Sequence, residues 1–445
     1  MPAKGRCQNF PRRLNPPLSF KEVDVGETLV EKLRSGNIPD KFEELCKKEN
    51  VDPVLLARDV IEGKAVAVGY RNGRSPFLLS QYARTKVNAN IGTSTNRSSL
   101  TEEMEKLHAA LSAGADAVMD LSLSPDLKEI RSAVLEHSSR PVGTVPIYEA
   151  AVRARTERGA AVKLDVEEIF DILEEQMEDG VDFMTIHAGV TRSLVMEFKK
   201  NSRLEGIVSR GGSILSSFIK RSGKENPFFE HFDRLLKLAQ KYDVVLSLGD
   251  GMRPGAIKDA GDYFEVGEQR ILGELVLRAR EAGVMCIVEG PGHVPLYMIG
   301  DAVKRMKKLS CNAPLYLLGP IVTDVAPGFD HITSAIGGAI AAWEGVEFLC
   351  YVTPSEHLGL PVPEDVFMGV VSARIAGHAA DIARGVKGAQ EWDNEMSKAR
   401  RELNWESMMN LSIHPETSRR LKLEKSGEGT CTMCGEYCVF LINED

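Results

Sequence analysis

Lys86-Val-Asn-Ala-Asn-Ile91 begins a rhythm in which short apolar runs alternate with longer amphipathic stretches. Helical spacing of apolar residues follows at 100–113, and the next apolar run is 117–121. Apolar strands that alternate with helices are typical of a parallel sheet covered on both faces. Because the rhythm lasts for about 300 residues, it favours a closed (β/α)8 barrel over an open sheet.

Nine runs fit a strand, which is one more than the barrel needs, and the shortest is 206–209. The expected strands are 86–91, 117–121, 143–147, 183–187, 206–209, 244–248, 285–289, 314–318 and 348–352. The expected helices between them include 100–113, 166–179, 228–241, 267–282 and 302–309.

The chain around this rhythm predicts three domains. Residues 1–75 are mixed and polar and predict a small N-terminal α/β domain, with a short strand at 65–69. Residues 76–363 form the catalytic barrel. Residues 364–445 form a helical C-terminal region, with helices expected at 364–384 and 394–410 and a polar tether at 424–430. Two further helices are expected near 25–33 and 39–48, and a third at 54–61.

Composition narrows the class of protein. The 445 residues are 43% hydrophobic, which is ample for a large core, and the net charge of −9 gives no general attraction to nucleic acid or anionic membranes. No run approaches the roughly 20 apolar residues of a membrane span, and the basic start lacks the apolar stretch of a signal peptide. Scattered cysteines indicate reduced thiols in a cytoplasmic protein. They are Cys7, Cys46, Cys286, Cys311 and Cys350.

Three further cysteines stand together in Cys431-Thr-Met-Cys434-Gly-Glu-Tyr-Cys438. Short spacings of this kind hold iron–sulfur clusters, and three thiolates leave one iron of a 4Fe–4S cluster open to a small molecule. A structural zinc site needs a fourth ligand, and the nearest histidine is His414. A cluster is the preferred interpretation, with zinc, a disulfide or coincidence as the alternatives.

Residues that can bind or react with a ligand recur where the expected strands end. In a (β/α)8 barrel the active site is assembled from those ends and the loops after them, so these residues predict one site at the barrel mouth. They are Asn88, Asn90, Met119, Asp120, Ser122, Tyr148, His187, Ser209, Arg210, Gly211, Gly212, Asp250, Arg253, Glu289, His293, Tyr316, Glu356 and His357.

Each group also has a structural interpretation. Ser209-Arg210-Gly211-Gly212 offers backbone N–H groups and a guanidinium to a phosphate, but Gly-Gly is also common in turns. Asp250 and Arg253 can pair with each other or hold a ligand. His293 and His357 can share a metal or be structural.

Asp324-Val-Ala-Pro-Gly-Phe-Asp330-His331 adds two carboxylates and an imidazole in a Gly-Pro segment. They are either acid–base groups or a loop held by its own hydrogen bonds.

Long segments of the chain resemble the thiamin pyrimidine synthase (phosphomethylpyrimidine synthase) family, from about residue 60 to Cys438. The segments that carry the resemblance are Lys86-Val-Asn-Ala-Asn-Ile-Gly92, Thr185-Ile-His-Ala-Gly-Val190, Ile207-Val-Ser-Arg-Gly-Gly-Ser213, Ser247-Leu-Gly-Asp-Gly-Met-Arg-Pro-Gly255, Glu289-Gly-Pro-Gly-His-Val-Pro295 and Cys350-Tyr-Val-Thr-Pro354.

The resemblance implies an atypical radical S-adenosylmethionine enzyme with a (β/α)8 barrel. It implies a 4Fe–4S cluster, S-adenosylmethionine and one divalent metal, zinc or iron, as cofactors, and 5-aminoimidazole ribotide as the substrate. It also implies a homodimer in which the cluster tail reaches the partner's barrel, and a reductant such as flavodoxin or ferredoxin.

By resemblance, the cluster ligands are Cys431, Cys434 and Cys438, and the metal ligands are His293 and His357. The implied substrate contacts are Asn90, Met119, Tyr148, His187, Ser209, Arg210, Gly211, Asp250, Arg253, Glu289 and Tyr316. Glu289, Tyr148 and Asp330 are the expected catalytic groups for proton transfer.

The chain departs from the family pattern beside these contacts. A usual tyrosine is Phe329, a usual Cys-His is Cys311-Asn312, and changes also occur around Asp262 and at 123–125. We therefore expect a paralogue with the same substrate and another product, 5-hydroxybenzimidazole synthase of anaerobic cobamide synthesis. The alternative is a phosphomethylpyrimidine synthase. A more distant alternative is a metal-dependent barrel hydrolase or aldolase whose cysteines form a zinc knot.

Overall fold

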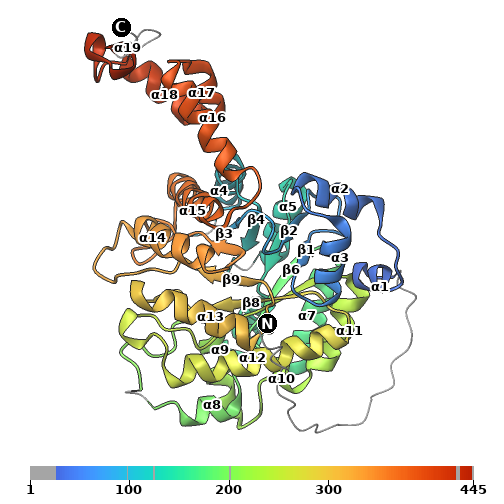
Figure 1. Ribbon diagram of the computed structural model, residues 1–445. Coiled ribbons are helices and arrows are strands. Elements are labelled where there is room, and N and C mark those ends of the chain that lie inside the picture. The colour runs from blue at the N-terminus through green and yellow to red at the C-terminus, as the bar shows by residue number, and fades with distance from the viewer. Residues whose placement is uncertain (1–26, 98, 124–125, 200–201, 427–430, 443–445) are drawn as a thin grey trace.

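The computed structural model contains a closed barrel of eight parallel strands surrounded by helices, which confirms the predicted (β/α)8 fold (Figure 1). It describes residues 27–97, 99–123, 126–199, 202–426 and 431–442. The last strand pairs with the first, with Phe348 opposite Lys86, so the barrel sheet has no free edge. The barrel strands are β3 Lys86–Ile91, β4 Ala117–Asp120, β5 Val142–Thr144, β6 Phe183–Ile186, β7 Val245–Leu248, β8 Cys286–Gly290, β9 Leu315–Leu318 and β10 Phe348–Cys350.

Helices cover the outside of the barrel and fix where each loop at its mouth begins and ends. Several start at a serine or aspartate whose side chain accepts a backbone N–H of the first turn, as Ser99, Asp165 and Asp262 do. The helices are α4 Leu100–Ala113, α5 Leu127–His137, α6 Pro146–Arg158, α7 Val166–Glu178, α8 Arg192–Glu197, α9 Arg210–Ser222, α10 Pro227–Glu230, α11 Phe232–Tyr242, α12 Tyr263–Glu281, α13 Ile299–Leu309, α14 Asp330–Trp343 and α15 Pro363–Arg384, with short 3-10 turns at Ile257–Asp259 and Leu296–Met298.

The ninth expected strand, 206–209, is wrong. This segment is a connection that ends at Ser209, because the Ser209 hydroxyl accepts the N–H of Gly212 and thereby starts α9. A different strand went unpredicted: β2 (Phe77–Leu79) pairs antiparallel with β1 (Val66–Val68) outside the barrel.

Two expected helices are each divided. The pattern at 228–241 forms α10 and α11, which meet at His231. The pattern at 394–410 forms α16 (Ala389–Arg401) and α17 (Trp405–Leu411), because Leu403 between them adopts a positive φ of 50°.

Helix α15 is long and apolar enough, by length and composition, to cross a membrane, and it is the one such helix among the described residues. It packs against α4, α14 and β3, and its inward side chains include Val366, Val370 and Ala376. We therefore interpret α15 as a barrel helix, although its pattern was grouped with the C-terminal region.

At the base of the barrel the same hydrogen-bonding arrangement occurs at three pairs of neighbouring strands. An acidic residue directly before a strand accepts the backbone N–H of the preceding strand. Asp116 binds Val87 at 3.0 Å, Asp182 binds Val142 at 2.8 Å, and Glu347 binds Leu315 at 2.8 Å. The three carboxylates pair with Arg84, Arg74 and Lys307, respectively. A strand end that is buried away from water is thereby satisfied.

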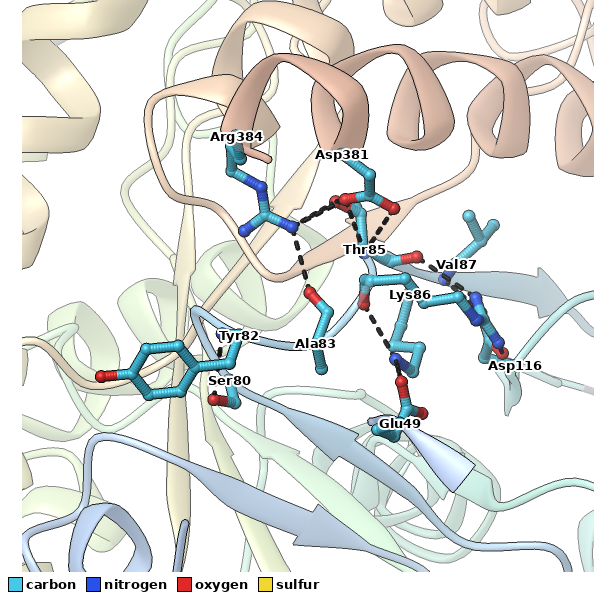
Figure 2. Close-up of polar contacts among 11 residues, drawn as sticks. Glu49, Ser80, Tyr82, Ala83, Thr85, Lys86, Val87, Asp116, Asp381 and Arg384 are labelled. Carbon is cyan, nitrogen blue, oxygen red and sulfur yellow. Dashed lines mark hydrogen bonds and ion pairs between the residues drawn. The ribbon is translucent and has the colours of Figure 1, made fainter. Parts of the chain in front are cut away.

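Lys86 lies at the centre of this base and is fully buried. Its ammonium group lies 3.0 Å from Glu49 and 2.8 Å from the Arg84 carbonyl. Figure 2 shows the contact with Glu49. Beside it, Asp381 of α15 accepts the N–H and hydroxyl of Thr85 (Figure 2). Because Glu49 ends α2, this network fastens both the N-terminal helices and α15 to β3.

The N-terminal helices α1 (Leu29–Arg34), α2 (Asp40–Lys48) and α3 (Pro53–Ile61) lie beside β1 and β2 (Figure 1). At the other end of the chain, α16, α17, α18 (Pro415–Ser426) and α19 (Val439–Ile442) form an arm that projects away from the barrel (Figure 1). Residues 1–26 and most of the expected tether, 427–430, lie outside the described residues. The division into three domains stays a prediction.

Candidate active site

A cavity of about 260 Å³ opens at the carboxyl ends of the barrel strands. Nine of the eleven expected substrate contacts line it: Asn90, Met119, Tyr148, His187, Arg210, Asp250, Arg253, Glu289 and Tyr316. These residues come from eight separate segments of the chain, and the closed barrel brings them together.

The other two expected contacts, Ser209 and Gly211, lie directly behind the cavity wall. The Ser209 side chain is occupied as the cap of α9. A Cβ on Gly211 would stand 2.3 Å from the His187 ring, and one on Gly212 would stand 2.0 Å from the Gly251 carbonyl. Glycine at both positions lets the start of α9 rest against the site, with Arg210 projecting into the cavity.

Two carboxyl groups, Asp250 and Glu289, face the cavity. Glu289 accepts hydrogen bonds from Thr185 at 2.7 Å and from Ser247 at 2.5 Å. Asp250 accepts one from Arg253 at 3.0 Å, and its second oxygen is buried without a partner. Burial raises the pKa of both carboxyl groups, and it raises that of Asp250 to about 7. Such a pair can exchange a proton with a bound molecule.

Cationic and neutral nitrogen groups complete the wall. The Arg210 guanidinium lies 4.9 Å from the centroid of the Tyr148 ring. Burial, with Arg253 nearby, lowers the pKa of His187 to about 3, so its imidazole is neutral at physiological pH. Arg210 and Arg253 therefore supply the positive charge of the cavity, and His187 adds hydrogen-bonding capacity without charge.

Polar residues outside the eleven expected substrate contacts also belong to the site, and two of them, Asn88 and Glu356, were among the residues expected at the barrel mouth. Cys350 and Glu356 line the cavity, and Thr185 both lines it and binds Glu289. Asn88 donates to the Tyr316 hydroxyl at 2.7 Å. Thr185 could have been found from the alternation of side chains along its strand, because it is separated by one residue from His187.

His293 and His357 lie together at the mouth, with ring centroids 5.2 Å apart. Nδ1 of His293 is 2.9 Å from Asp324, and Nδ1 of His357 is 3.0 Å from Asp330. A carboxylate on one ring nitrogen orients the imidazole and leaves the other nitrogen for a metal. The pair therefore fits a metal site with open positions, although no group of three metal-binding side chains occurs within the described ranges.

Asp330, one of the residues expected to transfer protons, lies beside the histidine pair. It begins α14, is buried, and lies 3.0 Å from Nδ1 of His357. This contact suits a carboxylate that orients the imidazole, and the expected role in proton transfer stays a prediction.

The three clustered cysteines belong to the arm, which projects away from the barrel of its own chain (Figure 1). Gly435 donates to the Cys431 carbonyl and Cys438 to that of Gly435, so consecutive turns keep the three thiols within one short segment. None of the three is in a disulfide, and Cys434 is exposed. Three accessible thiols in one turn fit an iron–sulfur cluster with one iron left open.

Comparisons with known proteins give one consistent result. The Radical SAM ThiC family matches residues 28–445. A phosphomethylpyrimidine synthase of Moorella thermoacetica is 50% identical over 419 residues, covering 93% of this chain and 97% of the relative. One of Thermoanaerobacter sp. (strain X514) is 51% identical with the same coverage. A solved dihydropteroate synthase of Coxiella burnetii, at 11% identity and a TM-score of 0.40, covers 69% of this chain and 95% of its own and carries no argument.

These matches overturn the expectation of a 5-hydroxybenzimidazole product and of a role in cobamide synthesis. The relatives that match nearly the whole chain at about half identity are phosphomethylpyrimidine synthases, which was the alternative. The hydrolase or aldolase interpretation with a zinc knot loses its basis as well, since the family match includes the cysteine segment.

Proposed function

Because the chain belongs to the radical SAM ThiC family, we propose that it is a phosphomethylpyrimidine synthase, which converts 5-aminoimidazole ribotide into a phosphorylated hydroxymethylpyrimidine for thiamin. The observation that carries this proposal is the match to such synthases over nearly their full length. The cavity supports it, since nine contacts implied by the resemblance line one space.

The cavity residues divide into groups suited to the parts of a ribotide. Arg210, at the start of α9, and Arg253 bind the phosphate, because guanidinium groups and helix N-termini both favour anions. Asn90 and Tyr316 offer hydrogen bonds to the ring or ribose. Asp250 and Glu289 exchange protons with the substrate as its bonds are rearranged.

A 4Fe–4S cluster with S-adenosylmethionine supplies a 5′-deoxyadenosyl radical when both are bound. Cys431, Cys434 and Cys438 would hold the cluster, and an electron donor such as flavodoxin or ferredoxin would reduce it. The barrel excludes water from the buried part of the cavity and keeps the substrate in one orientation.

His293 and His357 would hold the divalent metal, with Asp324 and Asp330 as their outer partners. The pair lies at the mouth beside the cavity, next to Glu356, which lines it. This location suits a metal that helps to place S-adenosylmethionine over the substrate.

The arm implies that the active site is shared between two chains. It carries the cysteines away from its own barrel, and the side chains of α19 are all exposed: Val439, Phe440, Leu441 and Ile442. Exposed apolar residues also occur in the segments that carry His293, His357 and their carboxylate partners, among them Tyr297, Val325 and Leu358. In the proposed homodimer the tip of each arm covers the mouth of the partner's barrel, which buries both apolar surfaces. A cytoplasmic location accords with the free thiols of the core.

The test is anaerobic incubation of the reconstituted protein with 5-aminoimidazole ribotide, S-adenosylmethionine and a reductant, followed by mass spectrometry. The expected products are the phosphorylated hydroxymethylpyrimidine, 5′-deoxyadenosine and methionine. A benzimidazole, or turnover of the ribotide without 5′-deoxyadenosine, would refute the proposal. The variant Cys434→Ser is the matched control, since it removes a cluster ligand without touching the barrel.

A further inference from the structure

Arg203 lies outside the cavity, and its side chain is fully buried. It forms a two-point ion pair with Asp262, with Nε and Nη2 each 2.7 Å from a carboxylate oxygen. It also donates to the Met252 carbonyl at 2.6 Å and to the Arg253 carbonyl at 3.1 Å. One buried guanidinium therefore joins the segment before α9, the loop after β7 and the start of α12.

The geometry of these contacts requires arginine. Its planar group presents donors in a fixed fork, whereas a lysine ammonium is a single point that cannot reach the carboxylate and both carbonyls together. The rings of Phe198 and Phe264 lie 6.0 Å and 5.9 Å from the guanidinium. In this apolar setting, each carbonyl that loses its donor is left without compensation from water.

The segments that Arg203 joins carry the two cationic groups of the cavity. The loop after β7 presents Arg253. The segment after Arg203 leads to Arg210, and it is fastened again where Asp259 accepts the N–H groups of Leu204 and Glu205. The start of α9 touches the same loop, because Gly212 lies against the Gly251 carbonyl.

We propose that Arg203, held by Asp262, is a positioning residue that sets the spacing between Arg210 and Arg253 and thereby the recognition of the substrate phosphate. The proposal rests on the proposed function, since the phosphate is that of the ribotide. Within the described part of the chain, the Arg203 guanidinium reaches one cavity-lining residue by a hydrogen bond, and that bond is to the backbone of Arg253, so Arg203 acts through the two loops.

The experiment measures binding of 5-aminoimidazole ribotide and of the matching riboside, which lacks the phosphate, by calorimetry on the reconstituted protein. The dissociation constant of the riboside divided by that of the ribotide gives the factor by which the phosphate strengthens binding. We expect Arg203→Lys to lower this ratio by about tenfold or more, because displacements of about 1 Å have effects of this size. Binding of the riboside is expected to change by less than about threefold.

Arg74→Lys is the matched control. Arg74 also pairs with an aspartate, Asp182, and binds the Gly180 and Leu135 carbonyls, but it lies at the base of the barrel. It is expected to lower the melting temperature and leave the ratio unchanged. An equal fall of the ratio in Arg74→Lys would show that general loosening is the cause and overturn the proposal.

Asp262→Asn serves if Arg203→Lys does not fold. Asparagine also caps a helix, so α12 still starts at this position, while the charge that holds Arg203 is removed. A smaller fall of the ratio, about threefold, is expected. An unchanged ratio in either folded variant would overturn the positioning role. A wild-type protein that binds ribotide no better than riboside would instead refute the proposed function, and the role of Arg203 with it.

Discussion

Replacing Asp330 distinguishes a carboxylate that orients a metal ligand from one that transfers protons. Asp330 lies 3.0 Å from Nδ1 of His357. If it orients the imidazole, Asp330→Asn keeps a hydrogen-bond acceptor and removes the charge, whereas Asp330→Ala removes both. The first effect of either change is then on metal affinity.

The size of the effect follows from burial. Loss of an outer-shell partner costs about 10- to 100-fold in metal affinity, or about 1.4–2.7 kcal/mol. The Asp330 side chain is 3% exposed, and that of Asp324, which binds His293 at nearly the same distance, is 34% exposed. Water screens the exposed carboxylate of Asp324 more than the buried one of Asp330. We therefore expect the metal affinity to fall about tenfold in Asp330→Asn, about 100-fold in Asp330→Ala and less than tenfold in Asp324→Asn.

The assay is titration with Co²⁺ in competition with a chelator, followed by visible absorption and metal analysis. All variants carry serine at the three cluster positions, Cys431, Cys434 and Cys438, so that thiolates do not bind the probe. The variant His357→Ala gives the Co²⁺ affinity that remains when one ligand of the histidine pair is missing. Turnover is measured in separate Asp330 variants that keep the three cysteines. If Asp330→Asn and Asp330→Ala bind Co²⁺ as tightly as the parent while the same substitutions lower turnover, Asp330 acts in proton transfer and the orienting role is refuted.

Four further outcomes are expected. Cys434→Ser should abolish the visible band of the reconstituted cluster and 5′-deoxyadenosine formation, yet leave the melting temperature within about 1 °C, because Cys434 is exposed on the arm. Mixed dimers of Cys434→Ser and Arg253→Ala chains should recover activity that neither parent shows; no recovery would place the cluster and the cavity in the same chain. Burial raises the pKa of Asp250 to about 7, so its protonated form is lost as pH rises, and kcat/KM for the ribotide should fall above about pH 7 in the wild type but not in Asp250→Asn. Burial lowers the pKa of Lys86 to about 8, so between about pH 8 and 10.4 the unfolded chain binds more protons than the folded one. The free energy of unfolding, measured by urea titration, should therefore rise by about 3 kcal/mol across this pH range. The variant Lys86→Met should remove the rise.

The barrel could be predicted because its signal is local and repeated. Eight apolar runs of strand length, most of them followed by a predicted helical pattern, correspond to the eight barrel strands. The cavity residues followed from the same rule, since the carboxyl ends of parallel strands meet at one face. The residues of the run 206–209 do not by themselves distinguish a connection from a strand. The segment is a connection because Ser209 caps the first turn of α9.

Partners that are distant in the sequence escape this reasoning. Asp330 and His357 are 27 residues apart, and Arg203 and Asp262 are 59 apart. In each case the residue type suggests a charge, but only the folded chain shows what the charge meets. The contact between Asp330 and His357 was therefore not predicted, and Arg203 was not singled out at all.

The error about the product has a structural cause, because the departures from the family pattern that fall on described residues lie outside the cavity wall. Phe329 is 62% exposed in the segment before α14, and Asn312 occupies a left-handed turn just before β9, at the opposite end of the barrel from the mouth. Asp262 binds Arg203 behind the β7 loop. Ser124 and Pro125 lie outside the described residues.

A different rearrangement of the same ribotide requires different groups around the reacting carbons. The positions that line the cavity, such as Asn90, Tyr148 and Glu289, are among those at which the resemblance implies the family's substrate contacts. Substitutions at an exposed phenyl ring or at the base of the barrel leave those groups where they were. They therefore carry no information about the product, and a change of product in this fold should be sought in the cavity wall.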